Sequence, residues 1–124
     1  MIIRGLTDVK HVEWGNGLSR RFLTEADGMG YSLTDTVVFK GTVSKLQYQQ
    51  HLEACYCISG SGAVETVAGE RIEISEGMMY ALDEHDAHLL IASENEDFRL
   101  VCAFAPALRG DEVHSLSADG YSRY

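Results

Sequence analysis

The chain is short of proline, cysteine and basic residues, and each shortage excludes a class of protein. Its 124 residues include one proline and three cysteines, and 19 aspartates and glutamates outnumber 10 lysines and arginines. The formal charge of -9 argues against nucleic acid or an anionic membrane as a partner. Three cysteines are too few, and odd in number, for a disulfide framework, so we expect reduced thiols and a cytoplasmic location.

Long hydrophobic runs are also missing. No apolar stretch approaches the roughly 20 residues that cross a bilayer, and Met1-Ile2-Ile3-Arg4 lacks the layout of a signal peptide. With 45% hydrophobic and 23% charged residues, the composition is that of a soluble globular protein. We therefore expect no membrane partner, and one domain over residues 1–124.

Glycine, by contrast, recurs at short intervals, with β-branched or alternating stretches between the glycines. These stretches are Thr34–Val38, Leu46–Tyr48, Ala54–Ile58, Val64–Val67, Arg71–Ile74, Met78–Leu82, His88–Ala92 and Phe98–Phe104. Many short strands separated by turns predict an all-β sandwich or barrel with little helix, at most a turn near Thr7–Val12. Asp27–Gly30 and Ala68–Glu70 are typical of hairpin turns.

The stretch around Glu53 places unusual chemistry on a strand. Side chains two apart share a face, so one face carries His51, Glu53, Cys55 and Cys57 and the other carries Leu52, Ala54, Tyr56 and Ile58. Both faces are largely apolar, which predicts a strand buried on both sides. A buried carboxylate is costly unless it is paired, protonated or bound to a metal. The alternative is that Glu53 lies near a rim and is solvated.

Tyr80 and His88 complete a candidate metal set with Glu53. Tyr80 follows the turn glycine Gly77, and His88 lies eight residues later. A carboxylate, a phenolate and an imidazole inside a small barrel form a hard, mixed oxygen and nitrogen site that favours iron. The alternative is that all three are ordinary strand residues. The cysteines allow a soft metal at Cys55 and Cys57, but small buried hydrophobic residues are the favoured interpretation, also for Cys102. His85, in a charged loop, is interpreted as solvated.

The glycine spacing resembles that of the cupins, small double-stranded β-helix (jelly-roll) barrels. Gly41 leads to His51-Leu52-Glu53 and then Gly60, and Gly69 leads to Ser75-Glu76-Gly77 and then Tyr80. Glu53 and Tyr80 stand where that family places histidines. The resemblance implies a single cupin domain with a metal site in the barrel.

A narrower resemblance, to the ectoine synthase family, covers nearly the whole chain. It rests on the run from His51 to Gly62, HLEACYCISGSG, and on the run from Tyr80 to His88, YALDEHDAH. Arg21-Phe22-Leu23 followed by DGMGYS resembles the N-terminal block, and Phe104–His114 with a final Asp119-Gly120-Tyr121 resembles the C-terminal one.

The resemblance implies closure of N-acetyl-2,4-diaminobutyrate into ectoine with loss of water, at an Fe(2+) site held by Glu53, Tyr80 and His88. It implies a homodimer packed through strands near the N-terminus. It also implies substrate contacts at Arg21, Thr36, Tyr48, His51, Leu82, Phe104, Glu112 and His114. The family has a tryptophan four residues before Arg21, where this chain has Gly17, and the nearby Trp14 is the candidate replacement.

The implied mechanism needs a general base, because an ammonium group is not a nucleophile. His51 and Glu112 are the candidate bases. Tyr48, His51 and His114 are the candidate proton donors to the leaving oxygen, and Arg21 would hold the substrate carboxylate. Two alternatives stay open: a related cupin enzyme acting on an amide or amidine in the hydrolytic direction, and a cupin that binds a small solute without chemistry.

Overall fold

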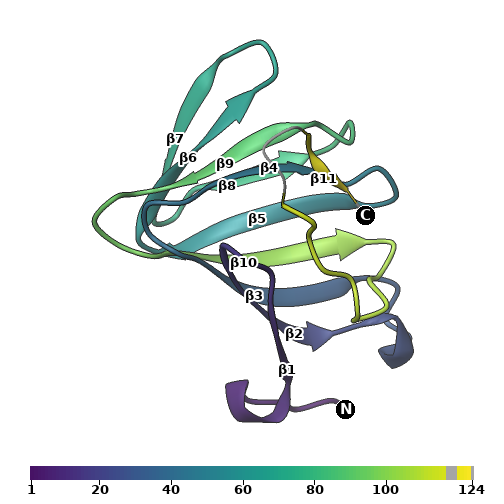
Figure 1. Ribbon diagram of the computed structural model, residues 1–124. Helices are drawn as coiled ribbons and strands as arrows, with labels where there is room; N and C mark the ends of the chain where they lie inside the picture. Colours follow the sequence, from purple (N-terminus) through teal and green to yellow (C-terminus); the bar gives the residue numbers. More distant parts are fainter. Residues whose placement is uncertain (117–119, 124) are drawn as a thin grey trace.

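The computed structural model describes residues 1–116 and 120–123 and consists of two facing β-sheets (Figure 1). The larger sheet has the order β1-β2-β3-β10-β5-β8 and the smaller one β11-β4-β9-β6-β7. All pairings are antiparallel except the short one between β11 and β4. Two 3-10 turns, η1 and η2, lie at Leu6–Asp8 and Glu25–Asp27.

The strands follow the glycine-punctuated pattern of the sequence. Their bounds are β1 Lys10–Glu13, β2 Gly17–Leu23, β3 Ser32–Val38, β4 Val43–Gln47, β5 Leu52–Ser59, β6 Ser61–Thr66, β7 Arg71–Ser75, β8 Met79–Leu82, β9 His88–Ala92, β10 Phe98–Ala105 and β11 Ser122–Arg123. Each of the eight predicted stretches overlaps one of β3 to β10. The hairpin turns between β2 and β3 and between β6 and β7 are confirmed, with Gly28 and Gly69 at positive φ.

β10 lies between β3 and β5 and supplies the centre of the core. Phe98, Leu100, Cys102 and Phe104 point inward and are at most 4% exposed, while the residues between them are less buried. This is the period-two alternation of a sheet with one covered face. Burial of each large apolar side chain contributes about 1.5–3 kcal/mol. The all-β prediction is therefore confirmed by a core that both sheets share.

Three local predictions need correction. β1, β2 and β11 were not predicted, and of Thr7–Val12 only the start belongs to a helical turn, η1, because β1 begins at Lys10. β5 is buried on one face only: Leu52, Tyr56 and Ile58 are 43%, 50% and 39% exposed, because none of the described residues covers the outer face of this sheet. Glu53 is 7% exposed, which excludes the solvated rim position.

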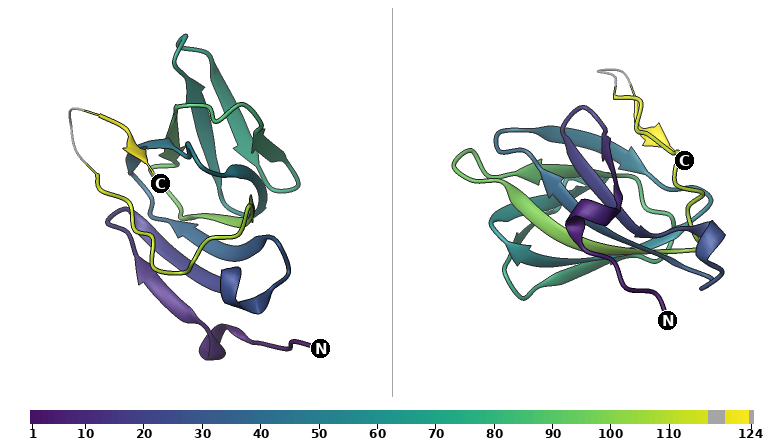
Figure 2. Two further views of the ribbon diagram at one scale, coloured as in Figure 1. Left: turned by 90° about the vertical axis from the view of Figure 1, so that its right-hand side faces the viewer. Right: turned by 90° about the horizontal axis from the view of Figure 1, so that it is seen from below.

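The C-terminal segment after β10 crosses one end of the barrel, from the larger sheet to β11 beside β4 (Figure 2). Leu108 anchors it, since this side chain is 1% exposed and its N–H donates to Ser32 Oγ at 2.6 Å. The segment therefore closes the end of the barrel rather than trailing away. Asp119, part of the C-terminal resemblance, lies outside the described residues. In the described part of the chain no helix has the length and apolarity to cross a membrane.

Candidate active site and metal centre

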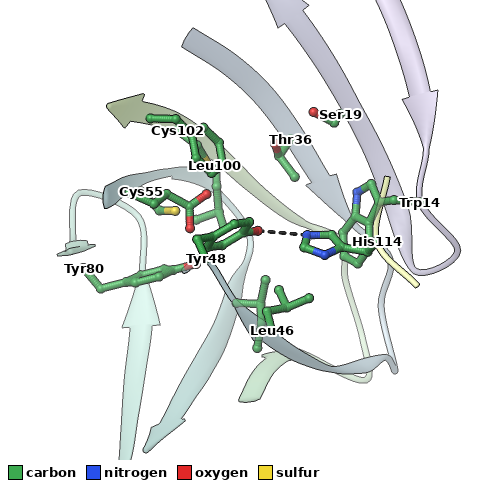
Figure 3. A pocket seen from close by; sticks show the side chains of 13 residues that line it. Trp14, Ser19, Thr36, Leu46, Tyr48, Cys55, Tyr80, Leu100, Cys102 and His114 are labelled. Carbon is green, nitrogen blue, oxygen red and sulfur yellow. Dashed lines mark hydrogen bonds between the residues drawn. The ribbon is translucent and has the colours of Figure 1, made fainter. Parts of the chain in front are cut away.

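A small cavity between the sheets collects most of the candidate residues (Figure 3). Its free volume is about 30 Å³, enough for water but not for a metabolite. The walls come from both sheets, from the stretch after β1 and from the C-terminal segment. The candidates among its lining residues are Trp14, Thr36, Tyr48, Glu53, Tyr80, Phe104 and His114.

Glu53 points into this cavity from β5. Burial raises its pKa to about 8, although hydrogen bonds from the thiols of Cys55 and Cys102 act in the opposite direction. In the metal-free protein the carboxyl group therefore keeps its proton at neutral pH. A bound cation would reverse this, because it would stabilise the carboxylate directly.

His88, the first residue of β9, is arranged as a ligand. Its Nδ1 lies 3.0 Å from the carbonyl oxygen of Asp86 and donates to it, which leaves the lone pair on Nε2. Nε2 is buried and has no hydrogen-bond partner among the described residues. Burial lowers the pKa of His88, so the ring is neutral. A neutral imidazole whose second nitrogen is fixed by a carbonyl is the usual form of a metal-ligating histidine.

Tyr80 lies between these two groups. It stands on β8 directly opposite Cys55 of β5, it lines the same cavity as Glu53, and its ring centroid is 6.3 Å from that of His88. Burial, followed by the negative charges of Cys55 and Glu53 when ionised, raises the pKa of the phenol well above its usual value. Tyr80 and His88 also share a second hollow, on the side of the β6–β7 hairpin.

These three side chains fit a metal ion by their own chemistry. The imidazole Nε2 of His88 has no hydrogen-bond partner among the described residues, and burial disfavours the charged forms of the Glu53 carboxyl group and the Tyr80 phenol, so a cation would favour all three as ligands. The donors are two oxygens and one nitrogen from β5, β8 and β9, which join both sheets at this point. Such a set suits iron better than a metal that requires thiolate ligands.

Arg21 lies on the opposite side of the site, on β2, and is 5% exposed. Its Nη2 donates to the carbonyl oxygen of Glu112, and its Nη1 lies 3.6 Å from Oε1 of the same residue. Nη1 has no hydrogen-bond partner among residues 1–116 and 120–123. The guanidinium therefore keeps one buried donor group available for an anion.

Glu112 and His114 lie on the C-terminal segment. The Glu112 carboxylate accepts from the backbone N–H groups of Arg109 and Gly110, each at 2.9 Å. Burial alone would raise its pKa, but these N–H groups and Arg21 more than offset that and lower it. His114 Nε2 lies 2.9 Å from Tyr48 Oη. Burial, then the nearby Arg21 and His88, lowers the pKa of His114 to about 3, so this ring is neutral too.

Trp14 occupies the space in front of Gly17. A Cβ at position 17 would lie 1.9 Å from the carbonyl oxygen of Val37 and 2.9 Å from Cζ2 of Trp14. No side chain fits there, and the indole of Trp14 lines the cavity instead, with its ring centroid 5.5 Å from that of His114. The aromatic wall that the resemblance implies thus comes from a different position in the chain.

Five candidates do not line the cavity itself: Arg21, His51, Leu82, His88 and Glu112. His51 is buried beside it, with Nδ1 donating to the carbonyl oxygen of Pro106 at 2.7 Å and its ring 6.2 Å from Phe104. Leu82 is buried but lines the second hollow rather than the cavity.

His85 is exposed in its loop, as predicted, but its contacts with two backbone carbonyl groups were not predicted. Its Nδ1 lies 2.8 Å from the carbonyl oxygen of Tyr48 and 3.1 Å from that of His51, so its loop fixes both backbones. It does so at a φ of 57°, which no sequence signal indicated.

Comparison with known proteins agrees with this arrangement. The family model described as ectoine synthase matches residues 1–122. An L-ectoine synthase from Desulfatibacillum aliphaticivorans is 50% identical over 121 residues, which is 92% of each chain. The chain belongs to the ectoine synthase family. A relative from Halalkalibacterium halodurans with the same name is 49% identical over 106 residues, 85% of this chain and 81% of that one.

Solved structures confirm the cupin barrel. The crystal structure of ectoine synthase from P. lautus has a TM-score of 0.84 and 42% identity, and the match covers 89% of this chain and 81% of that one. The polyketide cyclase RemF from Streptomyces resistomycificus has a TM-score of 0.74 at 20% identity over 98% and 90% of the two chains, a likeness of fold alone. The ectoine synthase match thus agrees in fold and in sequence.

Proposed function

We propose that this chain is an ectoine synthase that closes N-acetyl-2,4-diaminobutyrate into ectoine and releases water. The observation that carries the proposal is 50% identity over 92% of the chain to an L-ectoine synthase. It is joined to a cavity lined by Glu53 and Tyr80 and to an adjoining hollow lined by Tyr80 and His88. The enzyme class is that of a hydro-lyase acting on a small molecule.

Glu53, Tyr80 and His88 would hold Fe(2+). Bound there, the ion supplies Lewis acidity toward the acetamide oxygen of the substrate. The support is the unpartnered Nε2 of His88 and the raised pKa of Glu53. In the metal-free protein, burial of the unpartnered His88 nitrogen and of the Glu53 carboxyl group costs free energy, and a bound cation would offset that cost.

Of the two candidate bases, His51 is favoured over Glu112. The Nδ1–H of His51 donates to Pro106, which leaves Nε2 as a proton acceptor. The Glu112 carboxylate already accepts two backbone N–H bonds and faces Arg21, and its lowered pKa makes it a weak base. His51 would take the proton of the substrate ammonium, and the freed amine would attack the acetamide carbon.

Arg21 and the Tyr48–His114 pair supply binding and protonation. Arg21 Nη1, which faces Glu112 Oε1 at 3.6 Å without a hydrogen bond, would donate to the substrate carboxylate. Tyr48, hydrogen-bonded to the neutral His114, would deliver a proton as the oxygen of the tetrahedral adduct leaves as water. The cavity holds only about 30 Å³, so we propose that part of its lining moves as the substrate binds, and that this part is residues 106–116, which form no helix or strand. Closure afterwards would exclude water that reopens the ring.

The deciding experiment combines turnover with metal content. Iron-loaded protein is incubated with the N-acetyl-2,4-diaminobutyrate isomers and with ectoine, and Glu53→Ala, Tyr80→Ala and His88→Ala are analysed for bound iron. We expect ectoine to form in the wild type and iron to be lost in all three variants, with the exposed His11→Ala as the control that keeps both. Full iron in all three variants would refute the ligand assignment. Solute binding without turnover, or net hydrolysis of ectoine, would favour the alternatives.

We further propose a cytoplasmic homodimer. Three free, buried cysteines fit a reducing compartment. The proposed interface is the outer face of the larger sheet at β5 and β8, not the strands near the N-terminus that the resemblance implies. Tyr56 of β5 and Met79 of β8 are adjacent in register there and expose 50% and 60% of their surface, which a second copy would cover. Sedimentation of the wild type and of Tyr56→Glu would test this, and a monomeric wild type would refute it.

A further inference from the structure

Two cysteines share the cavity wall with Glu53 (Figure 3). Cys55 on β5 and Cys102 on β10 stand directly opposite each other in the antiparallel register and are 1% and 2% exposed. Their sulfur atoms and a carboxylate oxygen of Glu53 all lie within 4.8 Å of one another. Two thiols therefore lie beside the Glu53 carboxyl group, although the proposed iron site uses the carboxyl group and neither thiol.

The third cysteine marks the contrast. Cys57 shares a face with Cys55 and is equally buried, but its thiol faces the carbonyl oxygens of Ser59 and Gly60, at 3.5 and 3.6 Å. The pair in the cavity is thus Cys55 with Cys102 on the neighbouring strand, not the Cys55 and Cys57 of the sequence motif. Cys57 is thus accounted for by packing, whereas the thiols of Cys55 and Cys102 both interact with the Glu53 carboxyl group.

We propose that Glu53, Cys55 and Cys102 form a second metal-binding mode of this cavity, for a thiophilic divalent ion such as Zn²⁺ or Cd²⁺. The two thiols and the Glu53 carboxyl group each give a proton to solvent as their bonds to the metal form, so that three protons leave. The three anionic ligands surround the divalent ion with a fourth position left to water. Around tetrahedral zinc, thiolate sulfurs stand about 3.8 Å apart, as bond lengths of about 2.3 Å require. Because the donor atoms already lie within 4.8 Å of one another, an approach of at most about 1 Å brings the sulfurs to that spacing.

The two modes exclude each other because both use Glu53. This step rests on the proposed iron site. Sites with thiolate donors bind Zn²⁺ more tightly than Fe²⁺. The two thiols beside Glu53 would therefore let a thiophilic ion displace iron from this cavity. The enzyme would then be inhibited by zinc or cadmium through its own cavity wall.

Cobalt(II) tests this directly, because a cobalt–thiolate bond has a sulfur-to-metal charge-transfer band that oxygen and nitrogen ligands lack. Metal-free, reduced protein is titrated with Co²⁺ in wild type and variants. We expect the band in the wild type, about half of it in Cys55→Ala and in Cys102→Ala, and none in the double variant. Cys57→Ala, matched in burial and strand position, keeps the full band. Tyr80→Phe, which removes an iron ligand and no thiol, keeps it as well.

The result separates this inference from the iron proposal. A wild-type protein that binds iron and forms ectoine but shows no cobalt–thiolate band overturns the inference alone. A band that persists in the double variant, or that falls equally in Cys57→Ala, also overturns it. If the alanine variants do not fold, X-ray absorption of zinc bound to the wild type decides: two sulfur neighbours support the proposal, and none refutes it.

Discussion

The two sides of the cavity are built differently. Glu53, Tyr80 and His88 stand on β5, β8 and β9, whose backbones are fixed by ladders of paired residues. Glu112 and His114 stand on a segment without regular structure, held by the contacts of Arg21, Tyr48 and Ser32. Metal ligands need a fixed geometry, whereas a segment that contacts the substrate has to move so that the substrate can enter. The comparison predicts that damage to the strand side removes the metal and damage to the other side leaves it bound.

Glu53→Gln should have the largest effect, with loss of iron and of turnover by at least about 100-fold.

The same variant should stabilise the metal-free protein at high pH. The folded protein raises the pKa of Glu53 from 4.5 to about 8, so between these values the folded state keeps a proton that the unfolded state releases, and stability falls as pH rises. Denaturant unfolding at pH 5 and pH 8 should show this slope in the wild type and not in the variant. Equal slopes would contradict the assignment.

Arg21→Gln comes next. It removes a buried guanidinium whose free donor we assign to the substrate carboxylate, so kcat/KM should fall about 10- to 100-fold. Iron content should stay at the wild-type level, because no metal candidate is altered. Loss of iron together with activity would show that β2 supports the metal side, and the contrast between the two sides would fail.

Tyr48→Phe should lower kcat by about 10- to 100-fold, since it removes the proposed proton donor and its 2.9 Å contact with His114 while it keeps the ring. Bound iron should again be unchanged.

His114→Gln tests the same side of the cavity through the stability of the protein at acid pH. Because the folded state lowers the pKa of His114 from 6.5 to about 3, the wild type loses stability as pH falls through this window, and the variant should lose less. Unchanged acid unfolding would argue against a neutral His114.

Gly17→Ala should have the smallest effect on chemistry and a clear one on stability. The added methyl group would meet the Val37 carbonyl oxygen and Trp14, at a cost of about 1–3 kcal/mol. Gly5→Ala is the control, because its nearest neighbour would be Asp8 Oδ2 at an ordinary 3.5 Å. A thermal unfolding series decides, and equal stability of the two variants would mean that Gly17 is not a packing requirement.

Strands could be predicted where apolar side chains point inward and polar ones outward. They could not be predicted where the site places polar side chains on the inward face. β10 turns Phe98, Leu100 and Phe104 inward and is plain in the sequence. β2 turns Ser19 and Arg21 inward, and since buried polar residues resemble an exposed face, no strand was predicted there. β11 is too short to show a period.

The site could be predicted in part. Glu53 was identified by the cost of a buried carboxyl group, and that burial is observed. The backbone contacts of His85 and the thiol pair of Cys55 and Cys102 depend on neighbours far away in the sequence. Strand periodicity carries no information about such partners. The metal itself, and the assignment of Glu53, Tyr80 and His88 as its ligands, stay predictions.

The packing of Trp14 against Gly17 limits which single residues can be exchanged between homologues. A tryptophan at position 17, which the family resemblance implies, would meet the Val37 carbonyl oxygen and the indole of Trp14. Such a tryptophan therefore fits only together with a change at position 14 and a shift of the chain between the two positions, so a graft into this part of the barrel wall has to include both.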